Sequence, residues 1–184
     1  MAEPFPPGPW SSIQRALFDR RVVLLNGTVG QDQVDEAVAT LLALDALSDE
    51  RVELRLTAES DSLDVAFALM DAIDSLDVAV TATVIGWVAG TVVGVLASCS
   101  WRRIGPLGHL RLGEPTAGGA GVATDLSRQA REFEDRVSAY VRRLAEATGR
   151  PFEHIEADLR AGRVLDAHAA LAYGLVDELL ATDA

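Results

Sequence analysis

The stretch VAVTATVIGWVAGTVVGVLASCSW, residues 78–101, contains no charged side chain and joins two different patterns. Residues 78–85 alternate and are rich in β-branched side chains, which predicts a buried strand. The part from Gly90 is small and apolar, and it predicts a buried helix over 90–100. Several hydrolases present a serine nucleophile where a strand turns sharply into a helix. Here residues 86–91 read Gly-Trp-Val-Ala-Gly-Thr, so glycine stands where a nucleophile would be expected.

A membrane-spanning helix is the alternative interpretation of this stretch, because 18 or more apolar residues are long enough to span a bilayer. The stretch contains glycine and hydroxyl residues, its first half has strand periodicity, and no second span or basic loop asymmetry accompanies it. We therefore expect no membrane insertion. Residues 1–10 are proline-rich and lack the pattern of a secretory signal, which predicts a cytoplasmic protein.

The amino-acid composition excludes several classes of partner and of catalytic chemistry. The net charge of −12 over 184 residues argues against nucleic acid or anionic membranes as partners. All sixteen basic residues are arginine, which excludes Ser–Lys dyads, Schiff-base chemistry and a phosphate-loop lysine. The single Cys99 allows no internal disulfide and no cysteine metal cluster, and we expect it to be a buried packing thiol. We expect no cofactor and no metal.

Helical and strand patterns alternate along the rest of the chain, which predicts an α/β fold with parallel strands and right-handed crossovers. We expect residues 1–20 to form a proline-rich segment with a short helix, and residues 21–184 to form a single domain. The expected helices cover 11–18, 31–47, 63–73, 90–100, 125–148, 152–161 and 167–173. The expected strands cover 21–25, 52–56, 78–85 and 109–112.

The longest expected helix, 125–148, carries apolar residues at alternating steps of three and four. Such a stripe needs a partner surface, which is either the core or another subunit. Its members are Leu126, Ala130, Phe133, Val137, Tyr140 and Leu144.

Three separated segments keep the order and near-family spacing of one known family. They are RRVVLLNGTV at 20–29, GEPTAGGAGVATDLSRQAREF at 113–133 and AHAALAYGLVDELL at 167–180. Together they resemble the proteolytic subunit of the Clp protease, a serine peptidase. The resemblance implies a ClpP-like, crotonase-like β/α spiral with a protruding handle helix, the handle region covering about 113–148. It also implies subunits that assemble into stacked rings.

The same resemblance places glycines at the family's catalytic positions. The family's elbow, Gly-Gln-Ala-Ala-Ser-Met-Gly, matches 86–92, and its His-Gln-Pro matches 113–115. The nucleophile, base and acid therefore fall on Gly90, Gly113 and Gly162. The oxyanion loop Asn-Ser-Pro-Gly-Gly falls on 57–61, with Ser60 and Asp61 in place of its glycines. Glycine cannot attack, accept a proton or orient an imidazole. These positions predict a chain that is not an enzyme.

A displaced triad is the first alternative. Thr91 is the best substitute nucleophile, but a shift of one residue on a helix turns the side chain by about 100°. The only candidate bases are His109, His154 and His168, and Asp158 and Asp166 each lie four residues from Gly162. We do not expect these residues to assemble into a triad.

The glycines themselves allow two interpretations. In one, small residues have replaced the triad because constraint was relaxed; in the other, the cleft has been emptied and is filled by Trp87 or Glu59. Glycines 118, 119 and 121 follow no dinucleotide-binding pattern. We expect them in a flexible strand or loop that joins subunits, without phosphate binding.

The leading hypothesis is a catalytically inactive subunit that acts through oligomeric assembly. It would form a homo-oligomer, or join and regulate a ring with an active Clp peptidase subunit, with an ATP-driven unfoldase as a further partner. The alternatives are a residual or altered serine/threonine hydrolase, an acyl-thioester enzyme on the same fold, and a peptide-binding module. The charges of Glu59 and Asp61 beside the oxyanion amides oppose acyl-thioester chemistry.

Overall fold

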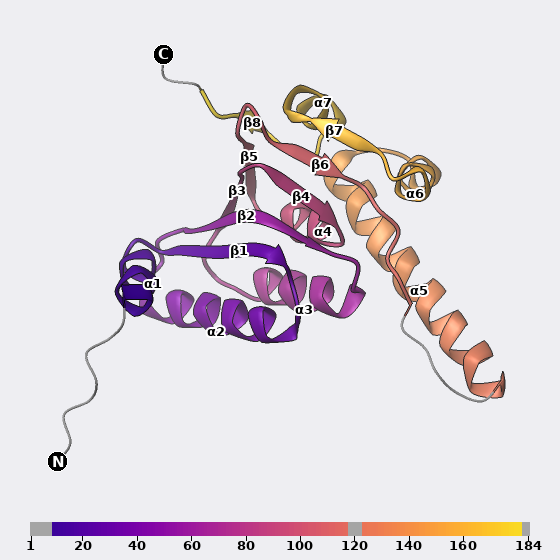
Figure 1. Ribbon diagram of the computed structural model, residues 1–184, viewed down its shortest axis with the longest axis horizontal. Coiled ribbons are helices and arrows are strands. Elements are labelled where there is room, and N and C mark those ends of the chain that lie inside the picture. The colour runs from indigo at the N-terminus through magenta and orange to yellow at the C-terminus, as the bar shows by residue number, and fades with distance from the viewer. Residues whose placement is uncertain (1–8, 118–122, 182–184) are drawn as a thin grey trace.

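The computed structural model describes residues 9–117 and 123–181, and within them it shows one sheet flanked by helices (Figure 1). The helices are α1 (Pro9–Asp19), α2 (Gln31–Leu47), α3 (Leu63–Asp74), α4 (Val92–Ala97), α5 (Ala123–Thr148), α6 (Phe152–Ala161) and α7 (Ala167–Tyr173). The strands are β1 (Val22–Thr28), β2 (Val52–Ser60), β3 (Val80–Val84), β4 (Trp87–Gly90), β5 (Trp101–Ile104), β6 (His109–Arg111), β7 (Val164–Asp166) and β8 (Glu178–Leu179).

The strands follow the order β7-β6-β4-β2-β3-β5-β8, and β1 pairs with the remaining side of β2. Every pair is parallel except β6 with β7. Parallel pairing requires crossover connections, and α2 and α3 supply two of them. The predicted α/β fold with parallel strands is therefore confirmed.

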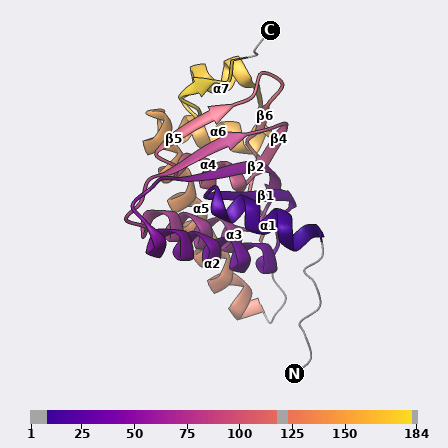
Figure 2. The ribbon, with the colours of Figure 1, turned by 90° about the vertical axis from the view of Figure 1, so that its left-hand side faces the viewer.

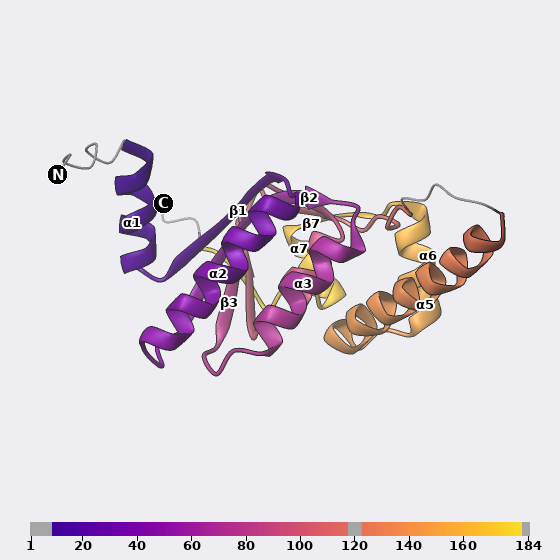
Figure 3. The same ribbon diagram turned by 90° about the horizontal axis from the view of Figure 1, so that it is seen from below.

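Helices α2 and α3 lie side by side on one face of the sheet (Figures 1 and 3), and α3 also contacts α4. Helix α2 shows why: Val34, Ala37, Leu41 and Leu44 recur at helical spacing and are all buried. The opposite face of β2 carries polar residues such as Arg55 that remain exposed, so this strand has one apolar and one polar face.

The stretch 78–101 differs from its predicted strand-to-helix turn. After β3 the chain bends at Gly86, which has a φ of +73°, and then forms the additional short strand β4 before α4 begins at Val92. Strand β4 lies between β2 and β6 in the sheet, and such pairing overrides local propensity. Strands β5, β7 and β8 were not predicted either, because two to four residues are too few to show periodicity.

Helix α5 extends beyond the body of the molecule at the end opposite to α1 (Figure 3). Its second half packs on the body: Tyr140, Val141 and Leu144 are buried, and Phe133 and Val137 are partly buried against the core. Ala130 is exposed, and the side chain of Leu126 lies outside the described residues, as do glycines 118, 119 and 121. The core thus accounts for the second half of the predicted stripe.

Candidate membrane spans were sought among the described residues. No helix there combines the length and the hydropathy that crossing a bilayer needs.

Candidate functional site

Gly90 ends β4 directly before α4, and its place follows from the sheet. Strand β4 pairs with the end of β2, so that Gly90 lies opposite Ser60. Gly90 has a φ of +63°, a conformation that glycine adopts without the steric cost an L side chain bears. The backbone here therefore favours glycine.

Main-chain atoms occupy the space beside Gly90. A Cβ built at this position would overlap with the carbonyl oxygen of Ser60 and would lie 2.9 Å from Oδ1 of Asp61. The nearest atoms belong to these two residues and not to Trp87 or Glu59, the side chains that one of the two interpretations places in the cleft. The loop that the resemblance assigns to the oxyanion hole thus lies directly against the position assigned to the nucleophile.

Thr91 is hydrogen-bonded to the same loop. Its N–H donates to the carbonyl of Ser60 at 2.6 Å. Its hydroxyl oxygen lies 3.0 Å from the carbonyl oxygen of Ser60 and 2.9 Å from that of Ser62, so these two acceptors share its single proton, and the residue is fully buried. A buried hydroxyl whose proton is held by carbonyl oxygens is a structural group, so Thr91 does not serve as the substitute nucleophile in this conformation. The amide after the elbow position, a usual oxyanion donor, is also already bonded.

Gly113 and Gly162 lie close to this junction. A Cβ on Gly113 would be 3.7 Å from Cα of Gly90. The N–H of Leu112, one residue before Gly113, donates to the carbonyl of Arg163, one residue after Gly162, at 2.8 Å. The fold therefore brings the sequence-predicted positions together. Gly162 itself ends α6 in the left-handed conformation, with open space where a side chain would extend.

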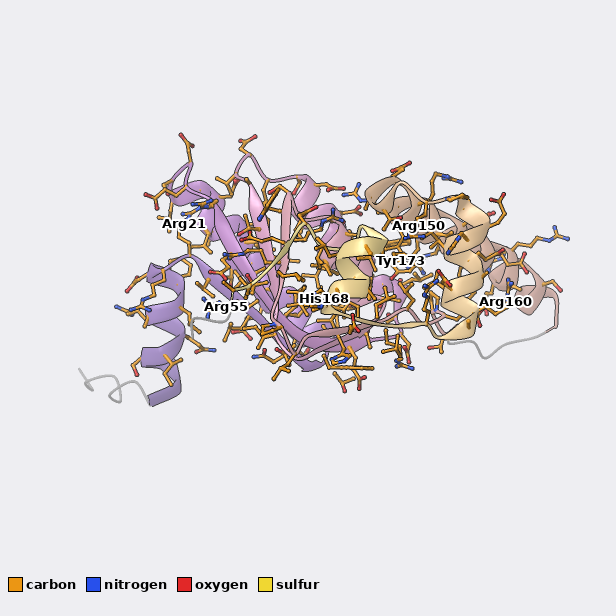
Figure 4. The ribbon with its side chains drawn as sticks, turned by 90° about the horizontal axis from the view of Figure 1, so that it is seen from above. Arg21, Arg55, Arg150, Arg160, His168 and Tyr173 are labelled. Atoms are coloured by element: carbon orange, nitrogen blue, oxygen red, sulfur yellow. The ribbon has the colours of Figure 1, made fainter. Side chains whose placement is uncertain are left out.

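The three histidines are not gathered there. His109 pairs with Trp87 across β4 and β6 and stacks on its ring with 6.3 Å between centroids. Trp87 is three residues from Gly90, a distance of about 10 Å along a strand. His154 pairs with Asp158, and His168 is exposed on α7 (Figure 4). The displaced triad is therefore not formed in the described structure.

Asp158 is the centre of a polar cluster that the sequence did not reveal. Its carboxylate accepts from the hydroxyl of Tyr173 at 2.6 Å and from Arg163 at 3.1 Å, and His154 lies 3.1 Å away. Arg150 lies over the ring of Tyr173 (Figure 4). Burial raises the pKa of Asp158, but the hydrogen bonds from Tyr173 and Arg163 outweigh it, so the pKa is lowered overall.

Asp166, the other acid near Gly162, has a different role. Its carboxylate accepts from the N–H of Ala169 at 2.8 Å and caps α7. A capping carboxylate satisfies a helix amide that would otherwise lack a partner. The residue is therefore structural.

Within 9–117 and 123–181 no group of three His, Cys, Asp or Glu side chains is arranged for a metal. Cys99 is 6% exposed, and burial raises the pKa of its thiol to about 12. The three atoms nearest to a Cβ at Gly90 are two main-chain atoms of Ser60 and Oδ1 of Asp61.

Comparison with known proteins identifies relatives over nearly the whole chain. The family model described as Clp protease matches residues 8–183. The ATP-dependent Clp protease proteolytic subunit 3 of Rhizobium meliloti is 31% identical over 166 residues, which cover 89% of this chain and 85% of that protein. The chloroplastic ATP-dependent Clp protease proteolytic subunit-related protein 2 of Arabidopsis thaliana is 29% identical over 176 residues, and the chain spans 62% of its length.

A solved structure agrees in fold. A ClpP1 mutant from Listeria monocytogenes superposes with a TM-score of 0.83 and covers 93% of this chain and 97% of its own. The sequence identity is 22%, so this match speaks for the fold alone. It confirms the predicted ClpP-like architecture.

The expectation that the chain is not an enzyme is corrected by these comparisons. The relatives are named proteolytic subunits of an ATP-dependent protease, and this points to an enzyme. That expectation rested on glycine at positions 90, 113 and 162 and on Ser60 and Asp61 in the oxyanion loop, and the relatives' names point the other way.

Proposed function

Because this chain belongs to the Clp protease family, we propose that it is a subunit of a Clp-type peptidase complex and that it acts through oligomeric assembly. The relatives are named proteolytic subunits of a protease, so peptide hydrolysis is the activity that those names describe. The names also call this protease ATP-dependent, and we therefore propose an ATP-driven unfoldase as a further partner.

The observation that carries this proposal is the form of α5. Its second half is fixed to the body by buried Tyr140, Val141 and Leu144. Ion pairs from Arg136 to Asp64 and from Arg143 to Asp74 tie the same helix to α3. A helix anchored in this way holds its protruding half in a defined direction, as an interface element must.

The protruding half offers a surface that the body does not cover. Ser127, Ala130, Arg131 and Glu134 are exposed. Isolated surface helices gain little stability from their own sequence, so a second copy or a related subunit packing here would stabilise it. We propose that assembly uses this half, with itself or with an active Clp peptidase subunit.

The test compares two Ala→Glu variants on α5. Ala130 lies in the protruding half and Ala139 in the half that packs on the body, and both are exposed. We expect Ala130→Glu to shift the native mass toward the monomer and Ala139→Glu to leave it unchanged. Native mass spectrometry of the chain alone, and mixed with an active Clp proteolytic subunit, gives the readout.

Activity is measured on the same samples. A fluorogenic peptide and a serine-reactive fluorophosphonate probe report on hydrolysis by the chain alone and in the mixture. We expect the chain to alter the peptidase rate of the mixture, and Ala130→Glu to remove that change. A monomeric mass in every mixture, or a peptidase rate unaffected by the chain, would refute the proposal.

A further inference from the structure

The last residue of β2 and the two residues after it lie across the candidate site. Strands β2 and β4 both run toward the side of the molecule on which α5 lies (Figure 1), and Ser60 pairs with Gly90 where β4 ends. We call residues 60–62 the strap. Each of its three main-chain carbonyls accepts a hydrogen bond from a residue outside the strap. The strap is therefore bonded to the segments that surround the site.

The carbonyl of Ser60 occupies a donor that a bound peptide would need. Thr91 follows the elbow position Gly90, and an amide at that place is a usual donor to the oxyanion of an acyl-transfer reaction. Here this N–H donates to the carbonyl oxygen of Ser60 at 2.6 Å, which is short for an N–H···O hydrogen bond. The proton of the Thr91 hydroxyl is also shared between the carbonyls of Ser60 and Ser62. A peptide carbonyl can reach this amide only after the strap has moved.

The second anchor of the strap lies after β6. The N–H of Thr116 donates to the carbonyl of Asp61 at 3.0 Å. Thr116 comes three residues after Gly113, and a Cβ on Gly113 would lie 3.7 Å from Cα of Gly90, so this segment borders the same junction. An extended peptide adds to a protein through main-chain hydrogen bonds of this kind. At this site the chain's own residues already make them.

The side chain of Ser60 holds the strap in this position. The residue is 6% exposed, and its hydroxyl oxygen lies 3.3 Å from the carbonyl oxygen of Val29 and 3.3 Å from the nitrogen of Ser62. The hydroxyl donates to the first and accepts from the second, so it connects the strap with the residue after β1. A glycine at position 60 would lack both contacts and would leave the backbone freer to rotate. Ser60 is therefore a positioning residue for the strap.

The strap lies at the surface, unlike the body of β2. Asp61 and Thr116 are exposed and Ser62 is partly buried, whereas the apolar residues of β2 are buried. Segments with few buried contacts open locally at a lower free energy than the core of a sheet. The strap can therefore leave the site while the sheet stays folded.

We propose that residues 60–62 are an autoinhibitory strap that competes with an extended peptide for the main-chain donors of the candidate site. In the closed state the carbonyls of Ser60 and Asp61 hold the N–H groups of Thr91 and Thr116. In the open state these two N–H groups bind carbonyls of the peptide. The inference rests on the proposed function for the class of ligand, a peptide, but it requires neither hydrolysis nor assembly.

Peptide binding by the full chain is the first test. The probe is fluorescein-labelled Ala-Leu-Ser-Leu-Ala with an amidated carboxyl end, read by fluorescence anisotropy. Apparent affinity rises in proportion to the fraction of chains in the open state. We expect Ser60→Ala to bind this peptide about fivefold more tightly than the parent, and Ser60→Gly at least about tenfold. The same sequence built from D residues should show no gain, because its twist opposes the pairing.

Ser75→Ala is the matched control. Ser75 ends α3 about 20 Å from Ser62, which begins it, and its hydroxyl donates to the carbonyl of Ala72 at 2.8 Å. This variant also removes a hydroxyl that is bonded to a main-chain carbonyl, so it should lose stability without gaining affinity. A gain in affinity that accompanies a loss of stability is the result that a merely structural role of Ser60 does not give. Circular dichroism confirms that each variant is folded.

Amide hydrogen exchange, followed by NMR on the same proteins, locates the opening. We expect exchange at Thr91 and Thr116 to be insensitive to low concentrations of urea, because the strap opens locally. Exchange at Leu54, buried in β2, should rise with urea, because it requires the sheet to unfold. Adding the L-peptide to Ser60→Gly should slow exchange at Thr91 and Thr116.

Several outcomes overturn the proposal. They are an unchanged peptide affinity in both Ser60 variants, an equal gain in Ser75→Ala or for the D-peptide, and urea-dependent exchange at Thr91. Native mass is recorded on the same samples and reports on assembly alone. A monomeric mass in every mixture together with a gain in affinity would refute the proposed function and leave the strap. Assembly without a gain in affinity would refute the strap and leave the proposed function.

Discussion

The hydroxyl of Tyr140 on α5 donates a hydrogen bond to the main-chain carbonyl of Gly90 at the end of β4, over 3.2 Å. Both residues are buried, and the ring of Tyr140 also fills the space against Gly94 on α4. One side chain thus connects the long protruding helix with the strand end at the candidate site. From the sequence, Tyr140 was predicted only to be one of the apolar residues along this helix, and its contact with Gly90 was not predicted.

Tyr140→Phe tests this connection. Removing the hydroxyl leaves the carbonyl of Gly90 without this donor, so we expect the free energy of unfolding to fall by about 1–2 kcal/mol. Tyr140→Ala also creates a cavity and should cost about 3–5 kcal/mol. Urea denaturation followed by circular dichroism measures both. A Phe variant as stable as the parent would mean that the hydrogen bond contributes nothing to folding.

A series of Gly→Ala variants tests the site's backbone. Gly90→Ala combines a left-handed φ with overlap against the Ser60 carbonyl, and we expect it to cost at least about 2 kcal/mol. Gly162→Ala has the left-handed φ but open space, and should cost about 1 kcal/mol. Gly113→Ala meets only ordinary contacts and should stay within about 0.5 kcal/mol of the parent. Thermal unfolding gives the order, and a different order would contradict the geometry described for the site.

Asp158→Asn tests the polar cluster through its pH dependence. The pKa of Asp158 is lower in the folded chain than its ordinary value of 3.8, so its stabilising effect is complete above that value. The effect is lost as the pH falls through the lowered folded pKa. We expect Asp158→Asn to be less stable by about 2 kcal/mol at neutral pH, since its carboxylate accepts charged and neutral hydrogen bonds.

A control variant, Asp71→Asn, distinguishes the effect of Asp158 on stability from that of an exposed acid. The gap between the parent and Asp158→Asn should narrow as the pH drops below about 4. Asp71, exposed on α3, has no side-chain partner among the described residues, so Asp71→Asn should follow the parent at every pH. A constant gap across the acid range would show that Asp158 acts by packing and not by charge.

Cys99 should be unreactive until the chain unfolds. Burial raises the pKa of its thiol to about 12, the Sγ–H donates to the carbonyl of Val95 at 3.4 Å, and the thiolate is the reactive form. Labelling with a thiol reagent at mildly alkaline pH should be negligible in the native chain and should reach one label per chain in concentrated guanidinium. Rapid native labelling would mean that α4 opens often.

Long periodic segments were predictable and short ones were not. The stretches 31–47 and 63–73 show their helices in the spacing of residues such as Leu41 and Met70, because burial on one face imposes that period. Strand β4 could not be predicted in this way, since Trp87 to Gly90 form a strand only through pairing with β2 and β6.

The candidate site was partly predictable. The resemblance to the Clp proteolytic subunit pointed to Gly90, Gly113 and Gly162, and the fold brings these positions together at the ends of β4, β6 and α6. The direction of the Ser60 carbonyl was not predictable, because the identity of a residue does not determine which way its main-chain carbonyl points. The cluster around Asp158 was missed for another reason: Arg163 and Tyr173 meet it only when β7 and α7 fold back.

Figure 2 shows β2 and β4 next to each other in the sheet. Where these two strands pair, their register places Ser60 opposite Gly90. Since the Ser60 carbonyl fills the place of a Cβ at Gly90, the two positions cannot be changed independently. A serine introduced at position 90 alone would meet a main-chain oxygen. Any redesign of this junction, in the laboratory or by natural variation, has to alter the end of β2 and the end of β4 in the same step.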